Sequence, residues 1–184
     1  MKERPYDFLA LNVRGFCTDS ALLTSTWPLS GMPRLLESLF DTVDGAVAVD
    51  WSAQGSLLPA AGGEAEVWLH LKAELSVPLQ CQRCLQAVQQ HLQVDRRFRF
   101  VRTESEAERL DETAEEDVMV LGQGLNLHDL LEDELILALP LVPRHEGTCP
   151  TPLPMPVDDL PEAEPAPNPF AALAALRAGK GGAK

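Results

Sequence analysis

The chain has 184 residues, and 15 Lys and Arg stand against 28 Asp and Glu, so its formal net charge at pH 7 is −13. This charge excludes a large, uniformly basic surface for nucleic acid. The hydrophobic fraction of 45% is enough for one globular core, since domains usually have about 100–200 residues, and we expect one domain with tails.

No apolar segment is long enough to cross a membrane. The longest uninterrupted apolar run, residues 135–142, has eight residues and contains a proline, whereas a membrane-spanning helix needs about 18 or more. The apolar patch at residues 8–11 is too short for the hydrophobic region of a signal peptide. We therefore expect a cytoplasmic protein whose four cysteines are reduced, without a disulfide framework.

The N-terminal third predicts little regular structure. Residues 1–30 show no clean hydrophobic period and are interpreted as an irregular or partly helical lead-in. Ser30 is a candidate N-cap for a short helix that contains residues 34–40, because the apolar positions there fit one helical face. Residues 45–51 alternate and are β-branched, which predicts a first strand.

A sustained alternation begins at residue 64. The odd positions from Ala65 to Leu79 are all apolar, and the even positions are mostly polar, which is typical of a half-buried strand. Pro78 requires a sheet edge or a bulge near the end of this strand.

The alternation resumes on even positions between Val88 and Phe100, which predicts a second long strand. The CxxC motif, Cys81 to Cys84, lies between the two strands. We therefore expect this motif to form the turn of a long antiparallel hairpin.

An acidic segment separates the hairpin from a final helix. Residues 104–117 hold eight acids and one base, and they are interpreted as an exposed loop or ragged helix. A short strand is expected over residues 118–121. Asn126 is a good N-cap for a helix over residues 127–138, which ends before Pro140.

The C-terminal part is rich in proline. Residues 150–167 combine closely spaced prolines with acids, a composition that cannot bury enough surface to fold alone, and are interpreted as a disordered linker. Residues 168–184 are expected to form a short helix and a tail. An apolar stripe on this helix, able to dock on the domain or in a partner groove, consists of Phe170, Leu173 and Leu176.

Together these elements predict an α+β fold. Its expected parts are an antiparallel β-sheet with a long hairpin through the CxxC turn, a few short helices packed on the sheet, and the Pro-rich acidic linker. The domain itself is assigned to residues 31–149, after the lead-in over 1–30.

Cysteine spacing raises the question of a metal site. Cys81 and Cys84 could both face one tetrahedral ion, at Zn–S distances of about 2.3 Å. The motif could instead be a redox pair, although its flanks are strands rather than a strand and a helix, or two incidental cysteines of a tight turn. His145 and Cys149 would complete one structural zinc site, but about sixty residues separate the halves, so a packing role stays open.

No catalytic residues are predicted. The sequence has no nucleophile elbow, Gly-rich phosphate loop or HExxH motif. Three acids at residues 132–134 are consecutive on one helix and therefore point in different directions. Glu134 lies near the apolar face, where an arginine partner would give it a structural role, so we expect a protein that is not an enzyme.

The remaining cysteine and histidines predict no site. Cys17 has no partner in sequence and is interpreted as a small buried hydrophobe. His70, His91 and His128 fall on the polar sides of their elements, where exposure to solvent is expected.

One local feature opposes the overall charge. Arginines are frequent in residues 96–102, and alternation places Phe98 and Phe100 on the core face. Arg97 and Arg99 share the other face, where they could contact nucleic-acid phosphates or pair with neighbouring acids.

Three stretches carry a family resemblance. They are residues 81–85, residues 131–145 with Cys149, and residues 167–176, and together they resemble the bacterial YceD family, the large ribosomal RNA subunit accumulation proteins, over roughly residues 30–176. The resemblance implies a non-enzymatic cytoplasmic factor that supports synthesis, processing or stability of the large-subunit (23S) ribosomal RNA. In some relatives the second half-site looks like a pair of cysteines. In this chain His145 stands in the place of the first of these cysteines.

The partners expected from this resemblance must fit a charge of −13. Extended phosphate binding needs an excess of Lys and Arg. We therefore expect a basic large-subunit ribosomal protein as the chief partner, and contact with large-subunit ribosomal RNA only through Arg97 and Arg99. No membrane and no small-molecule substrate is expected. The alternative is a small zinc-stabilised protein-interaction module without a ribosomal role.

Overall fold

The structure is a computed structural model that describes residues 6–40, 47–60 and 63–151. These residues belong to one unit, Met1–Pro152, while a second unit, Leu153–Lys184, lies outside the described residues. Nearly all of the predicted linker therefore lies outside them, as does the predicted stripe of Phe170, Leu173 and Leu176.

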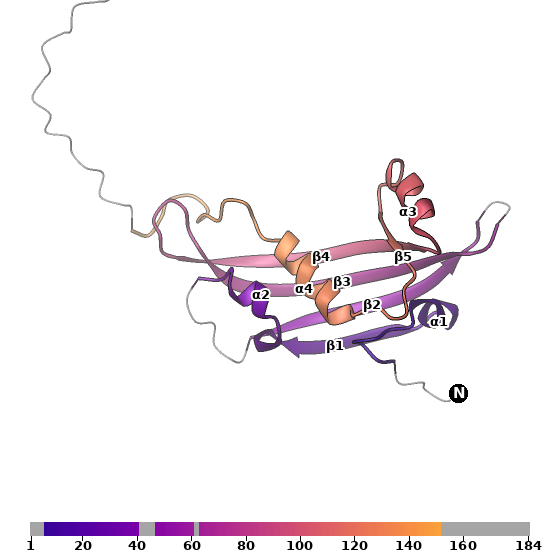
Figure 1. Cartoon of the computed structure of the whole chain (residues 1–184). Helices are drawn as coiled ribbons and strands as arrows, with labels where there is room; N and C mark the ends of the chain where they lie inside the picture. Colours follow the sequence, from indigo (N-terminus) through magenta and orange to yellow (C-terminus); the bar gives the residue numbers. More distant parts are fainter. Residues whose placement is uncertain (1–5, 41–46, 61–62, 152–184) are drawn as a thin grey trace, which may run out of the picture. The chain divides into compact units, whose positions relative to one another are not determined.

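Five strands form one sheet in the order of the sequence (Figure 1). They are β1 (Leu22–Pro28), β2 (Ala48–Leu58), β3 (Glu66–Gln80), β4 (Ala87–Val101) and β5 (Asp117–Val120). The first three pairings are antiparallel. The predicted α+β fold around a mostly antiparallel sheet is confirmed.

The last pairing, between β4 and β5, is parallel. Parallel neighbours need a crossover of about a dozen residues, because the chain must run back alongside the first strand before it can pair in the same direction. The acidic segment provides this crossover, and it contains the helix α3 (Glu104–Asp111), of which no residue is buried. The expected exposed, acidic segment is thus the connection that makes β5 parallel.

The predicted hairpin is the longest pairing of the sheet. β3 and β4 pair continuously from Val67 and Phe100 to Gln80 and Ala87, and the CxxC motif lies in the turn between them. The odd residues of β3 from Val67 to Leu79 are buried, as their alternation predicts.

Pro78 lies where a proline can be accommodated. β2 pairs with β3 only from Glu66 to Glu74, so the end of β3 has a described strand on one side only, that of β4. The register past Pro78 is unbroken, which supports the predicted edge rather than the bulge.

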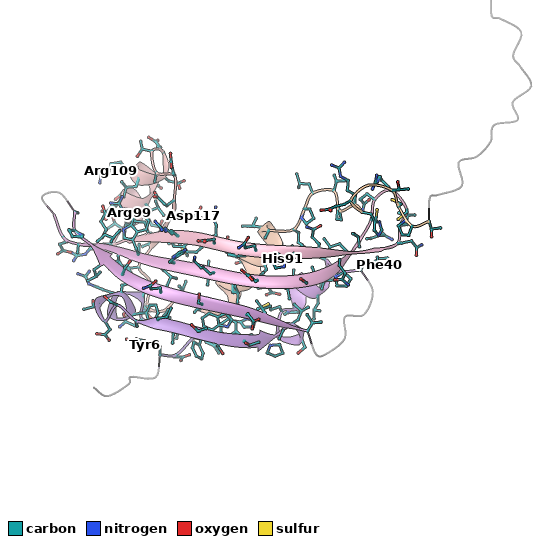
Figure 2. All side chains as sticks on the ribbon, turned by 180° about the vertical axis from the view of Figure 1, so that it is seen from behind. Tyr6, Phe40, His91, Arg99, Arg109 and Asp117 are labelled. Atoms are coloured by element: carbon teal, nitrogen blue, oxygen red, sulfur yellow. The ribbon has the colours of Figure 1, made fainter. Side chains whose placement is uncertain are left out.

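The helices cover one face of the sheet (Figure 1). They are α1 (Val13–Thr18), α2 (Pro33–Leu36) and α4 (Leu127–Leu137), together with the short 3-10 helix η1 (Leu29–Gly31). Between these helices and the sheet lies the core. Figure 2 shows the opposite face, which carries the polar residues of the alternating strands, including His91 and Arg99.

The lead-in over residues 1–30, interpreted as irregular or partly helical, contains in its described part the helix α1 and also the strand β1, which was not predicted. α1 packs on β2 at Gly55, where an added Cβ would lie 2.7 Å from the Phe16 ring and 2.9 Å from Cys17 Cα. β1 is the outer strand beside β2. Its inward residues Leu23, Ser25 and Trp27 are mixed in polarity and only half-buried, so their alternation gives a weak signal.

The helix expected after Ser30 is shorter and has a different cap. Ser30 lies in η1, and α2 begins at Pro33 with Met32 as its N-cap, which makes no side-chain hydrogen bond. The N–H groups of Arg34 and Leu35 donate instead to Oε1 of Glu132, at 2.7 and 3.1 Å. A cap supplied from a distant helix leaves no local sequence signal.

The first predicted strand extends further than its sequence pattern indicated, to Leu58 rather than residue 51. Its later inward positions, Ala53 and Gly55, are too small to be recognised as an apolar alternation.

The final helix agrees with the prediction. The Asn126 side chain accepts hydrogen bonds from the N–H groups of His128 and Asp129, and α4 buries Leu127, Leu131 and Leu135. Among the described residues, no helix is both long and apolar enough to cross a membrane.

Candidate metal centre

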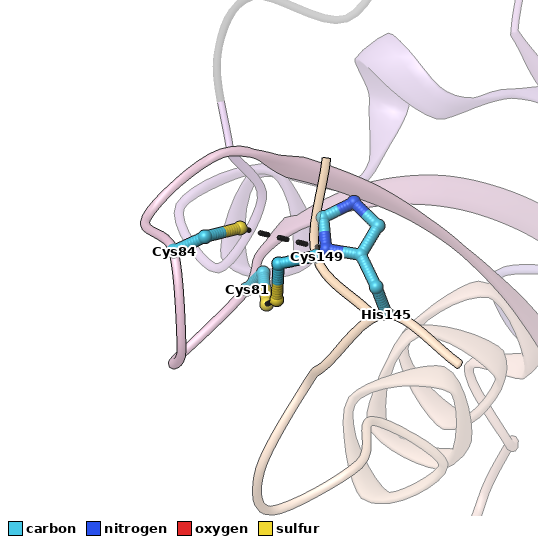
Figure 3. Close-up of side chains that lie close together, drawn as sticks. All are labelled: Cys81, Cys84, His145 and Cys149. Atoms are coloured by element: carbon cyan, nitrogen blue, oxygen red, sulfur yellow. Dashed lines mark hydrogen bonds between the residues drawn. The ribbon is translucent and has the colours of Figure 1, made fainter. Parts of the chain in front are cut away.

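The two predicted half-sites meet at the turn of the hairpin. Cys81 and Cys84 come from this turn, and His145 and Cys149 come from the loop that follows α4 (Figure 3). Their four ligand atoms all lie within 4.8 Å of one another. The four residues therefore lie close enough to hold a metal ion.

The spacing of the ligand atoms fits a tetrahedral zinc ion. Two sulfurs at about 2.3 Å from one zinc lie about 3.8 Å apart at the tetrahedral angle, and a sulfur and an imidazole nitrogen about 3.6 Å apart. The Sγ atoms of Cys81 and Cys149 are 3.9 Å apart. Sγ of Cys84 lies 3.5 Å from Nδ1 of His145.

A contact at the second ring nitrogen, Nε2, orients the imidazole of His145. Its Nε2 lies 3.1 Å from the carbonyl oxygen of Ala87, the first residue of β4. If Nε2 carries the proton and donates it to this carbonyl, Nδ1 is left free as a ligand atom. This arrangement, in which the second nitrogen is held by the protein, is typical of histidines that bind metals.

The thiols differ in acidity. Burial raises the pKa of Cys81, but hydrogen bonds, led by that of the Arg83 backbone, outweigh burial and bring this pKa to about 5. Burial and the neighbouring thiols of Cys84 and Cys81 raise the pKa of Cys149 to about 11. Cys81 is thus a thiolate at neutral pH, and a metal ion would displace the proton of Cys149.

The donor set is compatible with the zinc interpretation of the CxxC motif. All four cysteines of the chain are free, and the 3.9 Å between Cys81 and Cys149 is well beyond a disulfide of about 2.05 Å. The motif joins two strands and not a strand and a helix. Three sulfurs and one imidazole nitrogen are a donor set compatible with zinc.

Arg97 and Arg99, which the sequence singles out for phosphate contact, lie in different surroundings. Arg99 donates to Oε1 of Glu66 at 2.6 Å, and its guanidinium lies 5.9 Å from the centre of the Trp68 ring. Arg97 is exposed, and its side chain makes no hydrogen bond or ion pair with the residues that the structure describes. The pairing alternative thus holds for Arg99, and phosphate contact stays a prediction for both.

Two buried carboxylates on α4 are held by arginines. Glu134 lies 3.4 Å from Nε of Arg96, whose Nη2 also contacts Asp117 of β5. An arginine partner of Glu134, which the sequence left open, is therefore present. Glu132, which caps α2, also accepts from Nε of Arg34 at 3.0 Å. The sequence did not indicate this second contact, because Arg34 and Glu132 are far apart in the chain.

Cys17 is fully buried, as expected, and its Sγ lies 3.1 Å from the carbonyl oxygen of Trp68. Burial raises its pKa.

Exposure is confirmed for one of the three histidines. His91 is exposed, whereas His70 is half-buried beside Asp95. The expectation is also wrong for His128, whose ring lies 5.0 Å from that of Trp27. Trp27 belongs to an aromatic cluster with Phe8 and Trp51, which local sequence patterns cannot assemble.

Comparison with known proteins agrees with the resemblance in sequence. The family model described as "Large ribosomal RNA subunit accumulation protein YceD" matches residues 69–177, which include all four candidate ligands. A protein of that name from Haemophilus influenzae is 37% identical over 109 residues, which are 58% of this chain and 63% of the relative. No solved structure matches. Because the family model covers more than half of its residues, the chain belongs to the YceD family.

Proposed function

We propose that this protein is a non-enzymatic cytoplasmic factor that supports the synthesis, processing or stability of large-subunit ribosomal RNA. The observation that carries the proposal is the family match, together with the relative named for large ribosomal RNA subunit accumulation. The match to that relative spans 63% of its length, and the match to the family model, residues 69–177, includes the hairpin turn and the loop after α4.

The distribution of charge supports a basic protein as the chief partner. The exposed acids of α3 and of the residues after it lie at one end of β4, and the hairpin turn lies at the other end (Figure 1). Fifteen residues of strand separate these ends by about 50 Å. A basic large-subunit ribosomal protein would be attracted to the acidic end, and Arg97 would be available for RNA on the open face of the sheet.

A structural zinc is the cofactor that we propose for the metal centre. The ion would join the hairpin turn to the loop after α4, two segments that otherwise meet through a few polar contacts. All four ligand positions belong to protein side chains, as in structural rather than catalytic zinc sites. The engagement of Glu132 and Glu134 with arginines also supports a role without catalysis.

The metal proposal is tested by the zinc content of the purified full-length protein. We expect about one zinc per chain and a clear loss of zinc in the Cys84→Ser variant, since one of four ligands is removed. Cys17→Ser is the matched control, because Cys17 lies outside the cluster. Substoichiometric zinc that Cys84→Ser leaves unchanged would argue against the site.

The ribosomal proposal is tested by depleting the protein in cells that encode it. The abundance of large-subunit RNA relative to small-subunit RNA should fall, and expression of the wild-type chain should restore it. Capture of the tagged protein after nuclease treatment should recover basic large-subunit ribosomal proteins. If isolated large-subunit RNA binds tightly at physiological salt while no ribosomal protein is recovered, the preference for a protein partner is wrong.

A zinc-stabilised interaction module without a ribosomal role is the second candidate, and the four-residue cluster favours it. It predicts bound zinc with an unchanged ratio of the two ribosomal RNAs after depletion.

A further inference from the structure

We infer that Arg83 is a positioning residue that assembles the metal centre by holding the loop of the distal ligands against the hairpin turn. The inference rests on the proposed metal site and concerns how this chain builds it. Arg83 lies between Cys81 and Cys84, at one of the two variable positions of the CxxC motif, and is not itself a ligand.

Arg83 contacts the backbone of the loop after α4 at two positions. Its Nη2 donates to the carbonyl oxygens of His145 and Gly147, the second at 2.8 Å. His145 is itself a candidate ligand. Gly147 lies two residues before Cys149, which is the second candidate ligand in this loop. A single guanidinium therefore fixes the backbone from which both distal ligands extend, and such planar, charged donors bind carbonyls in a defined direction.

The conformation of the loop fits this role. Gly147 has φ 69°, in the left-handed region that favours glycine, so the chain turns there. Apart from the contacts among the four candidate ligand atoms, the loop makes two further polar contacts with the hairpin: the N–H of Gln82 donates to the carbonyl of Pro143 at 2.9 Å, and Nε2 of His145 lies 3.1 Å from the carbonyl oxygen of Ala87. None of these contacts needs a metal ion as a partner, so we expect them to hold the loop in the metal-free protein as well.

Preorganisation of this kind raises metal affinity, because the binding free energy is not used to order the loop. Residues that orient ligands from outside the ligand set typically change metal affinity about 10- to 100-fold when substituted. Arg144 offers a matched control in the same loop, because it is exposed and makes no hydrogen bond or ion pair with the rest of the described chain.

The experiment compares Arg83→Gln with Arg144→Gln in the full-length protein. Zinc affinity is measured by competition with a chelator, and amide hydrogen exchange of Gln82 is measured by NMR in the metal-free state. We expect about 10- to 100-fold weaker zinc binding for Arg83→Gln and wild-type affinity for Arg144→Gln. In the metal-free state, the Gln82 amide should be protected in the wild type and exposed to exchange in Arg83→Gln, with the amides of β3 unchanged.

Three results would overturn the inference. The first is wild-type zinc affinity in Arg83→Gln. The second is weaker zinc binding without any change in Gln82 exchange, since the charge of Arg83 would then act on the thiolates without positioning the loop. The third is a metal-free wild type in which Gln82 exchanges freely. If the wild type binds no zinc at all, the proposed metal site fails, and exchange at Gln82 alone decides the role of Arg83.

Discussion

Glu132 shows how one side chain can stabilise two elements. Its carboxylate is almost fully buried, caps the N-terminus of α2 and pairs with Arg34. Glu132→Ala should lower the free energy of unfolding by about 2–3 kcal/mol, because two N–H groups lose their acceptor and a buried pair is broken. Urea unfolding measures this loss. Asp133→Ala removes a half-exposed partner of the same arginine and should cost less than about 1 kcal/mol; equal losses would contradict the capping role.

Glu134 predicts a pH dependence of stability. Burial raises its pKa in the folded state, and the charge of Arg96 only partly opposes this. The folded state therefore keeps a proton that the unfolded state loses near pH 4.3, the ordinary value for glutamate. The contribution of Glu134 to stability falls as the pH rises through that value and levels off above the raised pKa.

The measurement is the free energy of unfolding of the wild type minus that of Glu134→Gln, as a function of pH. This difference should decrease as the pH rises from about 4, since Gln does not titrate. A difference that increases with pH would show that the pair with Arg96 dominates and that the pKa is lowered.

At the scale of elements, α1 and β2 touch at Gly55, where the chain has no room for a side chain. A Cβ would lie 2.7 Å from the Phe16 ring and 2.9 Å from backbone of Cys17. Gly55→Ala should therefore destabilise the protein by about 1–3 kcal/mol, as overpacking usually does, measured by thermal or urea unfolding. Gly122→Ala is the control, because nothing lies within 4 Å of its added Cβ. A neutral Gly55→Ala would mean that α1 can move away from the sheet.

The acidic helix α3 is the element most suited to test the partner. Replacing the exposed residues Glu108, Asp111 and Glu112 by their amides should weaken capture of basic ribosomal proteins several-fold at low salt, with a smaller effect at high salt. Stability should change by no more than about 0.5 kcal/mol per substitution, because no residue of α3 is buried. Unchanged capture would exclude α3 as the contact surface.

At the scale of the whole molecule, the sequence predicted what short-range patterns encode. The alternation of residues 65–79 and 88–100 predicted the hairpin, and Asn126 predicted the start of α4; all three agree with the structure. The two metal half-sites were recognised by residue type, but only the fold shows that they meet.

Long-range contacts account for what the sequence could not show. α2 is capped by Glu132, about a hundred residues away, and the half-buried ring of His128 packs against that of Trp27. The parallel pairing of β5 depends on the path of the acidic crossover and not on the composition of the strand. β1 was missed and α1 was not located within the lead-in, because their inward positions are mixed or few, so that tertiary packing decides their conformation.

The most direct measurement is the ratio of large-subunit to small-subunit ribosomal RNA in cells depleted of this protein and then supplied with either the wild-type chain or Cys84→Ser. We expect the ratio to fall on depletion, to recover with the wild type, and to recover less with the ligand variant. A ratio that depletion leaves unchanged would contradict the proposed function.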